Sequence, residues 1–236
     1  MVVFKAKKTI PFEMIEEQPM GKIKSSILLI DDQPMLRIGV KQTINTASFF
    51  EVIAETGSGT EGIQLAEKLD PDIILLDINI HDINGLEILR YLHARNISSR
   101  IIIFTVSDTK EDIITAFKNG ADGYLLKNME PEDFLKALKD ISEGKIIIEE
   151  AISHIILNSM RYNRSQIASQ THDISLLTPR EHEIFHLLVQ GLSNKLIANE
   201  LGIVESTVKV HIKRIFKKLN FKSRMEMTVW YLQSKK

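Results

Sequence analysis

The stretch Ile73-Ile74-Leu75-Leu76-Asp77 decides the fold, because it is a short apolar run that ends in a carboxylate. It follows the breaker Asp70-Pro71-Asp72, and four large apolar residues in a row indicate a strand buried on both faces, as in a parallel sheet. A second run, Ile27–Ile30, ends in Asp31-Asp32 in the same way. Open parallel sheets place their chemistry beyond the carboxyl ends of their strands. If the two strands are neighbours, three carboxylates converge at one edge, and their repulsion calls for a cation.

Strands and helices alternate from Ile27 onward, which is the sign of βαβ units. The predicted strands are Ile27–Ile30, Val52–Glu55, Ile73–Leu76, Ile101–Thr105 and Gly123–Leu126. The predicted helices are Met35–Ile44, Thr60–Lys68, Leu86–His93, Lys110–Asn119 and Pro131–Glu143. Five parallel strands with right-handed crossovers predict a flavodoxin-like, doubly wound α/β sheet.

The pattern after Leu177 is helical throughout and predicts a small all-α domain. Thr178–Glu181 is a capping box with proline at the first helical position, and Ser223–Glu226 is a second capping box. The predicted helices are 179–190, 194–201, 205–219 and a fourth that ends near Gln233. Two short helices that meet at a glycine turn, followed by a basic helix, are typical of a helix-turn-helix. Val204 offers no capping side chain, so we expect the third helix to be less well held at its start.

Length and charge indicate a two-domain chain. The 236 residues fit one or two domains. Between Ser25 and Lys145 there are 20 acidic and 12 basic residues, whereas between Thr178 and Lys236 there are 5 acidic and 11 basic residues. The basic half is therefore expected to face a polyanion. We divide the chain into a disordered extension (1–24), an acidic α/β domain (25–145), a linker (146–176) and a helix-turn-helix domain (177–236). The linker is expected to hold a helix over 151–162 and a flexible tether over 165–175.

Composition excludes several kinds of site. The chain has no cysteine, so disulfides, thiolate nucleophiles and cysteine zinc sites are ruled out. No apolar run approaches the roughly 20 residues of a membrane span. The first residues become charged too early for a signal peptide. We therefore expect a cytoplasmic protein without a membrane segment.

The predicted acidic edge suits phosphoryl chemistry. Asp31, Asp32 and Asp77 offer the hard oxygen ligands that Mg²⁺ prefers, and the ion would leave one carboxylate to act as a nucleophile toward phosphorus. Lys127 and Thr105 also follow strands and could each bind a phosphoryl oxygen on Asp77. Any one of these residues is more often a solvated loop residue, but five of them at strand ends in one domain favour a site.

The third helix of the basic domain carries a face suited to DNA. Its apolar residues recur at helical spacing and predict a buried stripe. Another face carries Lys209, Val210, Lys213 and Lys217, which fit base edges in the major groove. The side chains of Lys218, Lys222 and Arg224 are predicted to meet phosphates.

One motif in the basic domain resembles a catalytic zinc site. His182-Glu183-Ile184-Phe185-His186 matches the H-E-x-x-H pattern of zinc peptidases, and Glu200 is a conceivable third ligand. The helix already has a place in the helix-turn-helix, and its buried stripe puts both histidines on the solvent side. We therefore disfavour a zinc site.

The motifs of both domains resemble one family. The acidic half carries Ile30-Asp31-Asp32, Leu76-Asp77, Asn84-Gly85, Thr105 and 120–127 (GADGYLLK), which are similar to the receiver domain of two-component response regulators. The basic half carries 177–181 (LTPRE), 191–195 (GLSNK) and 207–211 (TVKVH), which are similar to LuxR-type helix-turn-helix domains. Together they resemble response regulators of the NarL/LuxR (FixJ) family, and within it the nitrate/nitrite regulators. The resemblance implies a CheY-like receiver fold.

The resemblance also implies residue roles. Asp77 would accept a phosphoryl group from a sensor histidine kinase, and Mg²⁺ would be held by Asp31, Asp32, Asp77 and the backbone carbonyl of Asn79. Lys127 would pair with the phosphoryl group, Thr105 would move toward it, and Tyr124 would turn inward. The protein would not be an enzyme, apart from a slow loss of its own phosphoryl group.

The implied function is phosphorylation-controlled transcription regulation in response to nitrate or nitrite. The protein would bind inverted half-sites of promoter DNA as a homodimer, with the acidic domain masking the basic helix until Asp77 is phosphorylated. The alternative is a constitutive DNA-binding regulator whose receiver serves only protein interaction. Two departures stand out: Gln33 replaces a usual histidine, and Ile80-His81 replaces a usual Met-Pro, which is expected to loosen the loop after Asp77.

Overall fold

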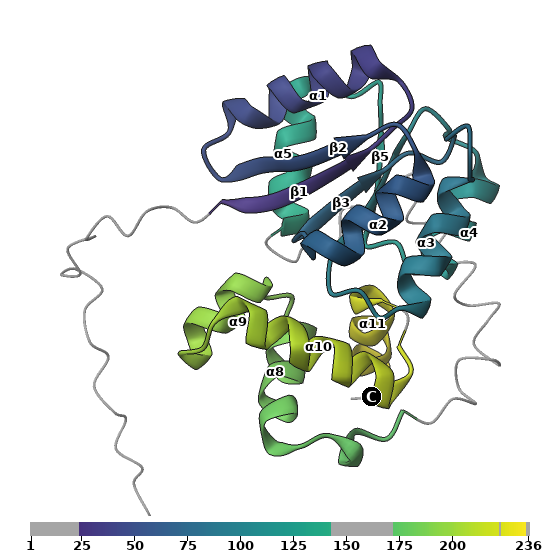
Figure 1. The fold of residues 1–236 in the computed structure, drawn as a ribbon. Helices are drawn as coiled ribbons and strands as arrows, with labels where there is room; N and C mark the ends of the chain where they lie inside the picture. The colour runs from purple at the N-terminus through teal and green to yellow at the C-terminus, as the bar shows by residue number, and fades with distance from the viewer. Residues whose placement is uncertain (1–23, 143–171, 222, 235–236) are drawn as a thin grey trace, which may run out of the picture.

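The computed structural model describes residues 24–142, 172–221 and 223–234. These residues form an α/β domain and a helical domain that lie against each other (Figure 1). The predicted extension (1–24) apart from Lys24, most of the linker and the predicted helix over 151–162 lie outside the described residues. Within the described part, no helix has both the length and the apolar character that a membrane crossing requires.

The α/β domain is built on a five-stranded parallel sheet, as predicted. Its strands are β1 (Ser25–Ile30), β2 (Phe50–Thr56), β3 (Ile73–Leu76), β4 (Arg100–Thr105) and β5 (Gly123–Leu126). Their order is β2-β1-β3-β4-β5, and every neighbouring pair is parallel. The strand order reverses direction between β1 and β3, and open α/β sheets place their ligand sites beyond the carboxyl ends of strands at such a point.

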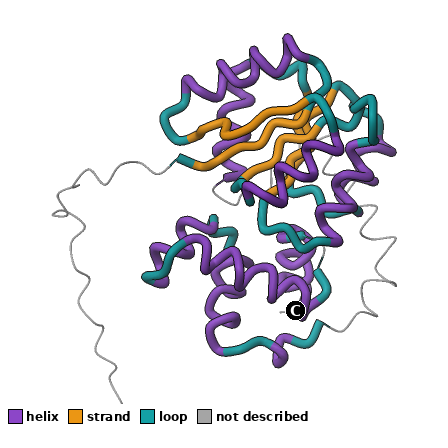
Figure 2. Tube along the Cα trace, in the orientation of Figure 1, coloured by secondary structure: helices purple, strands orange, loops and turns teal. Residues whose placement is uncertain are grey.

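Helices cover both faces of the sheet (Figures 1 and 2). The helices are α1 (Pro34–Thr46), α2 (Gly59–Leu69), α3 (Gly85–Ala94), α4 (Lys110–Lys118) and α5 (Pro131–Ser142). One core forms where Val40 of α1 and Leu138 of α5 meet Leu75 of β3, and the other forms where Ile88 of α3 meets Ile74. All four residues of β3 are buried because both of its faces are covered.

The helical domain contains the predicted four helices. They are α8 (Pro179–Val189), α9 (Asn194–Leu201), α10 (Glu205–Leu219) and α11 (Arg224–Ser234), preceded by a 3₁₀ turn, η1 (Ile174–Leu176). The capping box of Thr178 and Glu181 forms as predicted. Gly202 ends α9 with a φ of 62°, a left-handed conformation that glycine adopts without strain. The side chain of Val204 makes no cap to α10, also as predicted.

The last residues of the predicted flexible tether, 172–175, are held by specific contacts, and residues 165–171 lie outside the described residues. The side chain of Asp173 accepts a hydrogen bond from the amide of Ser175 at 2.9 Å, which holds η1. The ring of His172 is buried and stacks on Phe221 with centroids 3.9 Å apart. This contact spans distant parts of the domain, so the polar composition of the segment gave no sign of it.

Candidate functional site

The strand ladder places the three predicted strand-end residues side by side. The amide of Asp31 donates to the carbonyl of Thr56 at 3.0 Å, and the amide of Asp77 donates to the carbonyl of Ile30 at 2.9 Å. The amide of Lys127 donates to the carbonyl of Thr105 at 2.9 Å. Parallel pairing therefore continues one residue past each strand and fixes where these side chains begin.

The side chains meet in a buried cluster. Lys127 Nζ lies 2.8 Å from Asp31 Oδ2 and 2.7 Å from Asp77 Oδ2, and these three side chains are at most 3% exposed. Burial raises the pKa of Asp31, although the hydrogen bond from Lys127 opposes the change. A single cation thus links two carboxylates that would otherwise repel each other.

The cluster fits a divalent ion. Asp31, Asp32 and Asp77 offer carboxylate oxygens that lie within 4.8 Å of one another, and no other group of this kind occurs among the described residues. Asp77 Oδ1 is buried and has no hydrogen-bond partner in the described part of the chain. An orphaned carboxylate oxygen beside two more carboxylates is the donor set of a hard cation. Asn79 lies two residues after Asp77, with an exposed side chain.

Thr105 and Tyr124 occupy the neighbouring strand ends. Thr105 is fully buried, and its hydroxyl accepts a 3.4 Å hydrogen bond from the amide of Ser107. The hydroxyl of Tyr124 donates to the carbonyl of Ser107 at 2.8 Å, so this ring already points inward. Burial raises the pKa of Tyr124. Ser107 thus links the two proposed switch residues, a role that its sequence position did not reveal.

The loop after Asp77 is held at two points. Ile80, which stands where the family usually has methionine, is 7% exposed and packs into the core. The carboxylate of Asp82 accepts hydrogen bonds from the amides of Gly59 and Thr60 at 2.8 and 3.0 Å and from the hydroxyl of Ser58. These bonds lower the pKa of Asp82, the amide of Thr60 having the largest effect. No motif in the sequence singled out Asp82, and the expected loosening of the loop stays a prediction.

The predicted DNA-reading face of α10 lies against the α/β domain. Lys209 Nζ donates to the carbonyl of Asp70 at 2.6 Å and lies 3.0 Å from Asp72 Oδ1. Lys213 Nζ lies 3.2 Å from Asp70 Oδ1. Val210, between them in the sequence, remains 46% exposed. Two of the three predicted base-reading lysines, Lys209 and Lys213, therefore contact carboxyl and carbonyl groups of the loop that precedes β3, whereas the third, Lys217, is exposed.

The predicted phosphate-contacting residues are distributed differently. Lys218 pairs with the buried carboxylate of Glu181 at 2.7 Å. Arg224 is 7% exposed and donates to the side chain of Asn194, so the structure does not place it on an open surface. Lys222 lies outside the described residues. DNA contacts by these residues remain predictions.

The H-E-x-x-H motif does not assemble a metal site with Glu200. The rings of His182 and His186 lie 6.3 Å apart, and Glu200 is exposed. Among the described residues, the only group of three potential metal ligands is the aspartate cluster. His186 is exposed as expected, while His182 is half-buried.

Comparison with known proteins agrees with this geometry. Residues 27–139 match the response regulator receiver domain, and residues 175–231 match the bacterial regulatory proteins of the luxR family. The chain is 52% identical to the nitrate/nitrite response regulator protein NarL of Escherichia coli K12, over 89% of this chain and 96% of that protein. It is 40% identical to NarP of the same organism, over 89% of this chain and 95% of that protein.

A solved structure adds to this likeness. A LuxR-family two-component response regulator from Aurantimonas sp. SI85-9A1 is 28% identical, with a TM-score of 0.54 over 58% of this chain and 99% of that one. The receiver match, the luxR-family match and the near-complete coverage of both relatives all agree. The chain therefore belongs to the two-component response regulators that join a receiver domain to a luxR-type DNA-binding domain.

Proposed function

We propose that Asp77 is the phosphorylated residue of this regulator and that a sensor histidine kinase is the donor. The observation that carries the proposal is the buried contact of Lys127 with both Asp77 and Asp31. A phosphoryl group on Asp77 brings new negative charge to the place where an ammonium is already held. Asp31, Asp32, Asp77 and the backbone carbonyl of Asn79 would hold Mg²⁺, which neutralises charge on the transferring group.

The transfer itself is an in-line displacement. A carboxylate oxygen of Asp77 forms the new bond to phosphorus as the bond from phosphorus to the donor's imidazole nitrogen breaks, and that nitrogen keeps the electron pair. The ammonium of Lys127, which contacts the carboxylate of Asp77 before the transfer, then pairs with the phosphoryl oxygens. The hydroxyl of Thr105 is a further donor to these oxygens, and its movement would release the contact of Ser107 with Tyr124.

We further propose that the unphosphorylated α/β domain masks the DNA-binding face. The contacts of Lys209 and Lys213 with Asp70 and Asp72 occupy two of the four side chains predicted to read bases. This contact lies at the beginning of β3, whereas Asp77 follows its end, so phosphorylation would act across the length of the sheet. The names of the relatives support nitrate or nitrite as the signal. Release would allow the chain to dimerise on inverted half-sites.

Footprinting on promoter DNA with and without a small phosphodonor tests the proposal. We expect protection of paired half-sites at lower protein concentration after treatment, together with a mass increase of one phosphoryl group. Asp77→Asn should show neither change. DNA affinity that is identical with and without the phosphoryl group would favour the constitutive regulator.

Asp72→Asn tests the masking contact separately. The amide keeps the shape that receives the hydrogen bonds of Ser26 but removes the charge that attracts Lys209. We expect the unphosphorylated variant to bind DNA about three- to tenfold more tightly, because a charge-assisted contact of about 1 kcal/mol is lost only in the masked state. Glu67→Gln, which removes an equal charge from α2 where Glu67 pairs with Arg95, is the matched control. Equal affinities for the two variants would contradict masking.

A further inference from the structure

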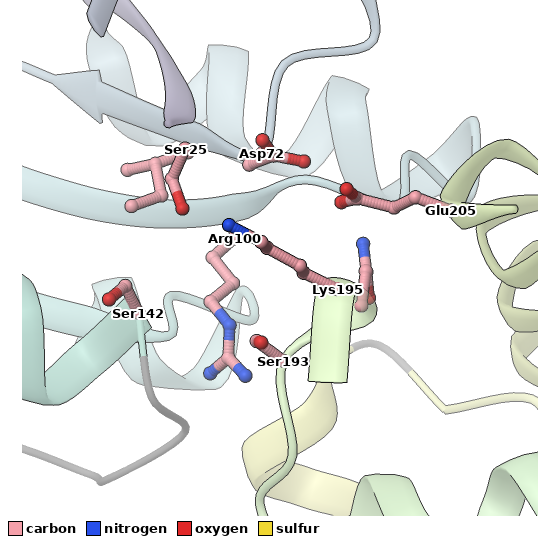
Figure 3. Close-up of a pocket in the computed structure, with 9 residues that line it drawn as sticks. Ser25, Asp72, Arg100, Ser142, Ser193, Lys195 and Glu205 are labelled. Carbon is pink, nitrogen blue, oxygen red and sulfur yellow. The ribbon is translucent and has the colours of Figure 1, made fainter. Parts of the chain in front are cut away.

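Two contacts at the start of α10 exist only while the two domains are docked. Glu205, the first residue of α10, extends toward Asp72 of the α/β domain (Figure 3), and Lys209 Nζ lies 3.0 Å from Asp72 Oδ1. Within its own domain this end of the helix has no side-chain cap, because Val204 offers no acceptor for the first amides. A different part of the helical domain must therefore hold α10 in a fixed direction when the domains separate.

The other end of α10 is held by the segment 172–176, which precedes α8 in the sequence. The Nδ1 atom of His172 lies 2.5 Å from the carbonyl oxygen of Leu219, the last residue of α10. A carbonyl oxygen can only accept a hydrogen bond, so Nδ1 carries the proton and donates it. The last four carbonyls of a helix have no partner within the helix, and the ring of His172 satisfies one of them.

The ring of His172 is also packed between aromatic side chains. It is 8% exposed, stacks on Phe221 with centroids 3.9 Å apart, and meets the ring of Trp230 edge-on with centroids 5.4 Å apart. Phe221 lies two residues after the end of α10, and its amide donates to the carbonyl of Phe216 at 3.3 Å. The imidazole therefore joins the end of α10 to α11, through a hydrogen bond on one side and ring contacts on the other.

Lys218 makes a second contact between α10 and the segment 172–176. Its Nζ atom donates to the carbonyl of Leu176 at 3.1 Å and to the buried carboxylate of Glu181 at 2.7 Å. Lys218 and Leu219, the last two residues of α10, are thus joined to groups that lie 42 and 47 positions earlier in the chain. The segment 172–176 and the end of α10 therefore form one unit within the helical domain.

We propose that His172 is a positioning residue that determines the specificity of DNA reading, because it holds the end of α10 and thereby sets the direction of the helix. It does so from a place ahead of residues 175–231, the part of the chain that matches the luxR family. Contacts with base edges depend on the direction of the helix, whereas the attraction of its lysines to phosphates does not. The inference rests on the proposed reading of DNA by α10. It does not rest on masking, since every contact of His172 given above lies within the helical domain.

The ratio of specific to non-specific DNA affinity tests this role. The full-length chain, treated with a small phosphodonor, is titrated at one salt concentration against labelled DNA that carries the footprinted half-sites and against a scrambled duplex of equal length. We expect His172→Ala to weaken specific binding about five- to tenfold, as for a lost hydrogen bond to a buried carbonyl, and non-specific binding less than about twofold. His182→Ala removes a half-buried histidine of α8 and is the matched control, which should leave both affinities unchanged.

Two conservative replacements separate the hydrogen bond from the ring contacts. His172→Asn keeps an amide donor near the position of Nδ1 but no ring, and His172→Phe keeps a stacked ring but no donor. Each should restore part of the specific affinity that His172→Ala loses. Trp230 is the only tryptophan of the chain, so its emission reports the ring contact. The emission should shift to longer wavelength in His172→Ala and His172→Asn, where water replaces the ring, and should stay in place in His172→Phe.

Three outcomes would overturn the positioning role. Equal losses of specific and non-specific affinity would assign His172 to the stability of the fold alone, and an unchanged ratio in all three variants would exclude any effect on reading. Val210→Ala identifies the third outcome, because Val210 is 46% exposed on the predicted reading face of α10. Loss of specific affinity in Val210→Ala but not in His172→Ala would refute positioning alone. Unchanged specific affinity in both variants would refute DNA reading by α10 itself.

Discussion

A methyl group on Gly85 would lie 2.0 Å from the carbonyl oxygen of Asp77 and 2.8 Å from Cα of Ile78. Both neighbours are backbone atoms, which cannot turn aside as a flexible side chain can. The amide of Gly85 also donates to the carbonyl of Ile78 at 2.8 Å and closes the acceptor loop. Only glycine at position 85 therefore leaves room for the backbone of Asp77 and Ile78 in its present position.

Gly85→Ala should accordingly displace the acceptor segment. We expect the free energy of unfolding to fall by about 2 kcal/mol, as for other overpacked sites, and phosphorylation by a small donor to slow markedly. Urea unfolding and the rate of the phosphoryl mass increase measure the two effects. Gly39→Ala is the control, because a methyl group there meets nothing within 4 Å and helix propensity alone should make it neutral or slightly stabilising. Equal behaviour of the two variants would contradict this account.

At the scale of elements, the acceptor loop and α2 are joined through Asp82. Its carboxylate accepts hydrogen bonds from the first two amides of that helix, while Ser58 caps the amide of Glu61. A negative charge at the amide end of a helix is favourable. These hydrogen bonds thereby fix the loop after Asp77 to a helix that precedes it in the sequence.

Asp82→Ala should destabilise the α/β domain by about 1 kcal/mol, the usual value of a lost cap. Hydrogen bonds to the charged form lower the pKa of Asp82 in the folded state. Its contribution is therefore complete above the ordinary aspartate pKa and disappears as the pH falls through the lower, folded value. Urea unfolding at neutral and strongly acidic pH should show the difference from wild type only at neutral pH. Asp108→Ala, at an exposed loop position, serves as the control. An equal loss of stability in both variants would argue against a stabilising role for the hydrogen bonds of Asp82 with α2.

At the scale of the whole molecule, an acidic pair lies in the contact between domains. Glu205 begins α10 and faces Asp72, with Lys209 and Lys195 also acting on it. Burial and the neighbouring Asp72 raise the pKa of Glu205 to about 7, whereas the pKa of Asp72 is lowered. In the docked arrangement Glu205 therefore holds a proton that it would release to water after the domains separate.

The proton on Glu205 determines how docking of the two domains changes with pH. Docking binds a proton between the ordinary glutamate pKa of 4.5 and about 7, so raising the pH through this window favours separation, by at most about tenfold per unit. We expect the unphosphorylated chain to gain DNA affinity from pH 6 to 7.5 relative to Glu205→Gln, which cannot titrate. Fluorescence anisotropy at fixed salt measures both proteins. The same pH profile for the two would exclude a role for Glu205.

The sequence alone determined the order and type of the elements. The apolar runs ending in Asp31, Asp77 and Thr105 predicted the strands within one or two residues, because strands buried on both faces leave a strong and local signal. The capping box of Thr178 and the glycine turns defined the helical domain for the same reason. The position of Lys127 after a strand indicated its place beside Asp77, whereas the switch role of Tyr124 is implied only by the resemblance to receiver domains.

The contacts between residues far apart in the sequence were decided only by the tertiary structure. The bridge from Lys127 to both aspartates, the tether of Asp82 to α2 and the contact of α10 with Asp70 and Asp72 join residues 22 to 143 positions apart. Composition and periodicity describe which side of its own element a residue faces, not which distant group meets it. Charge, burial and distance act through space, so the pairings that hold the acceptor site and cover the DNA-reading face exist only once the chain is folded.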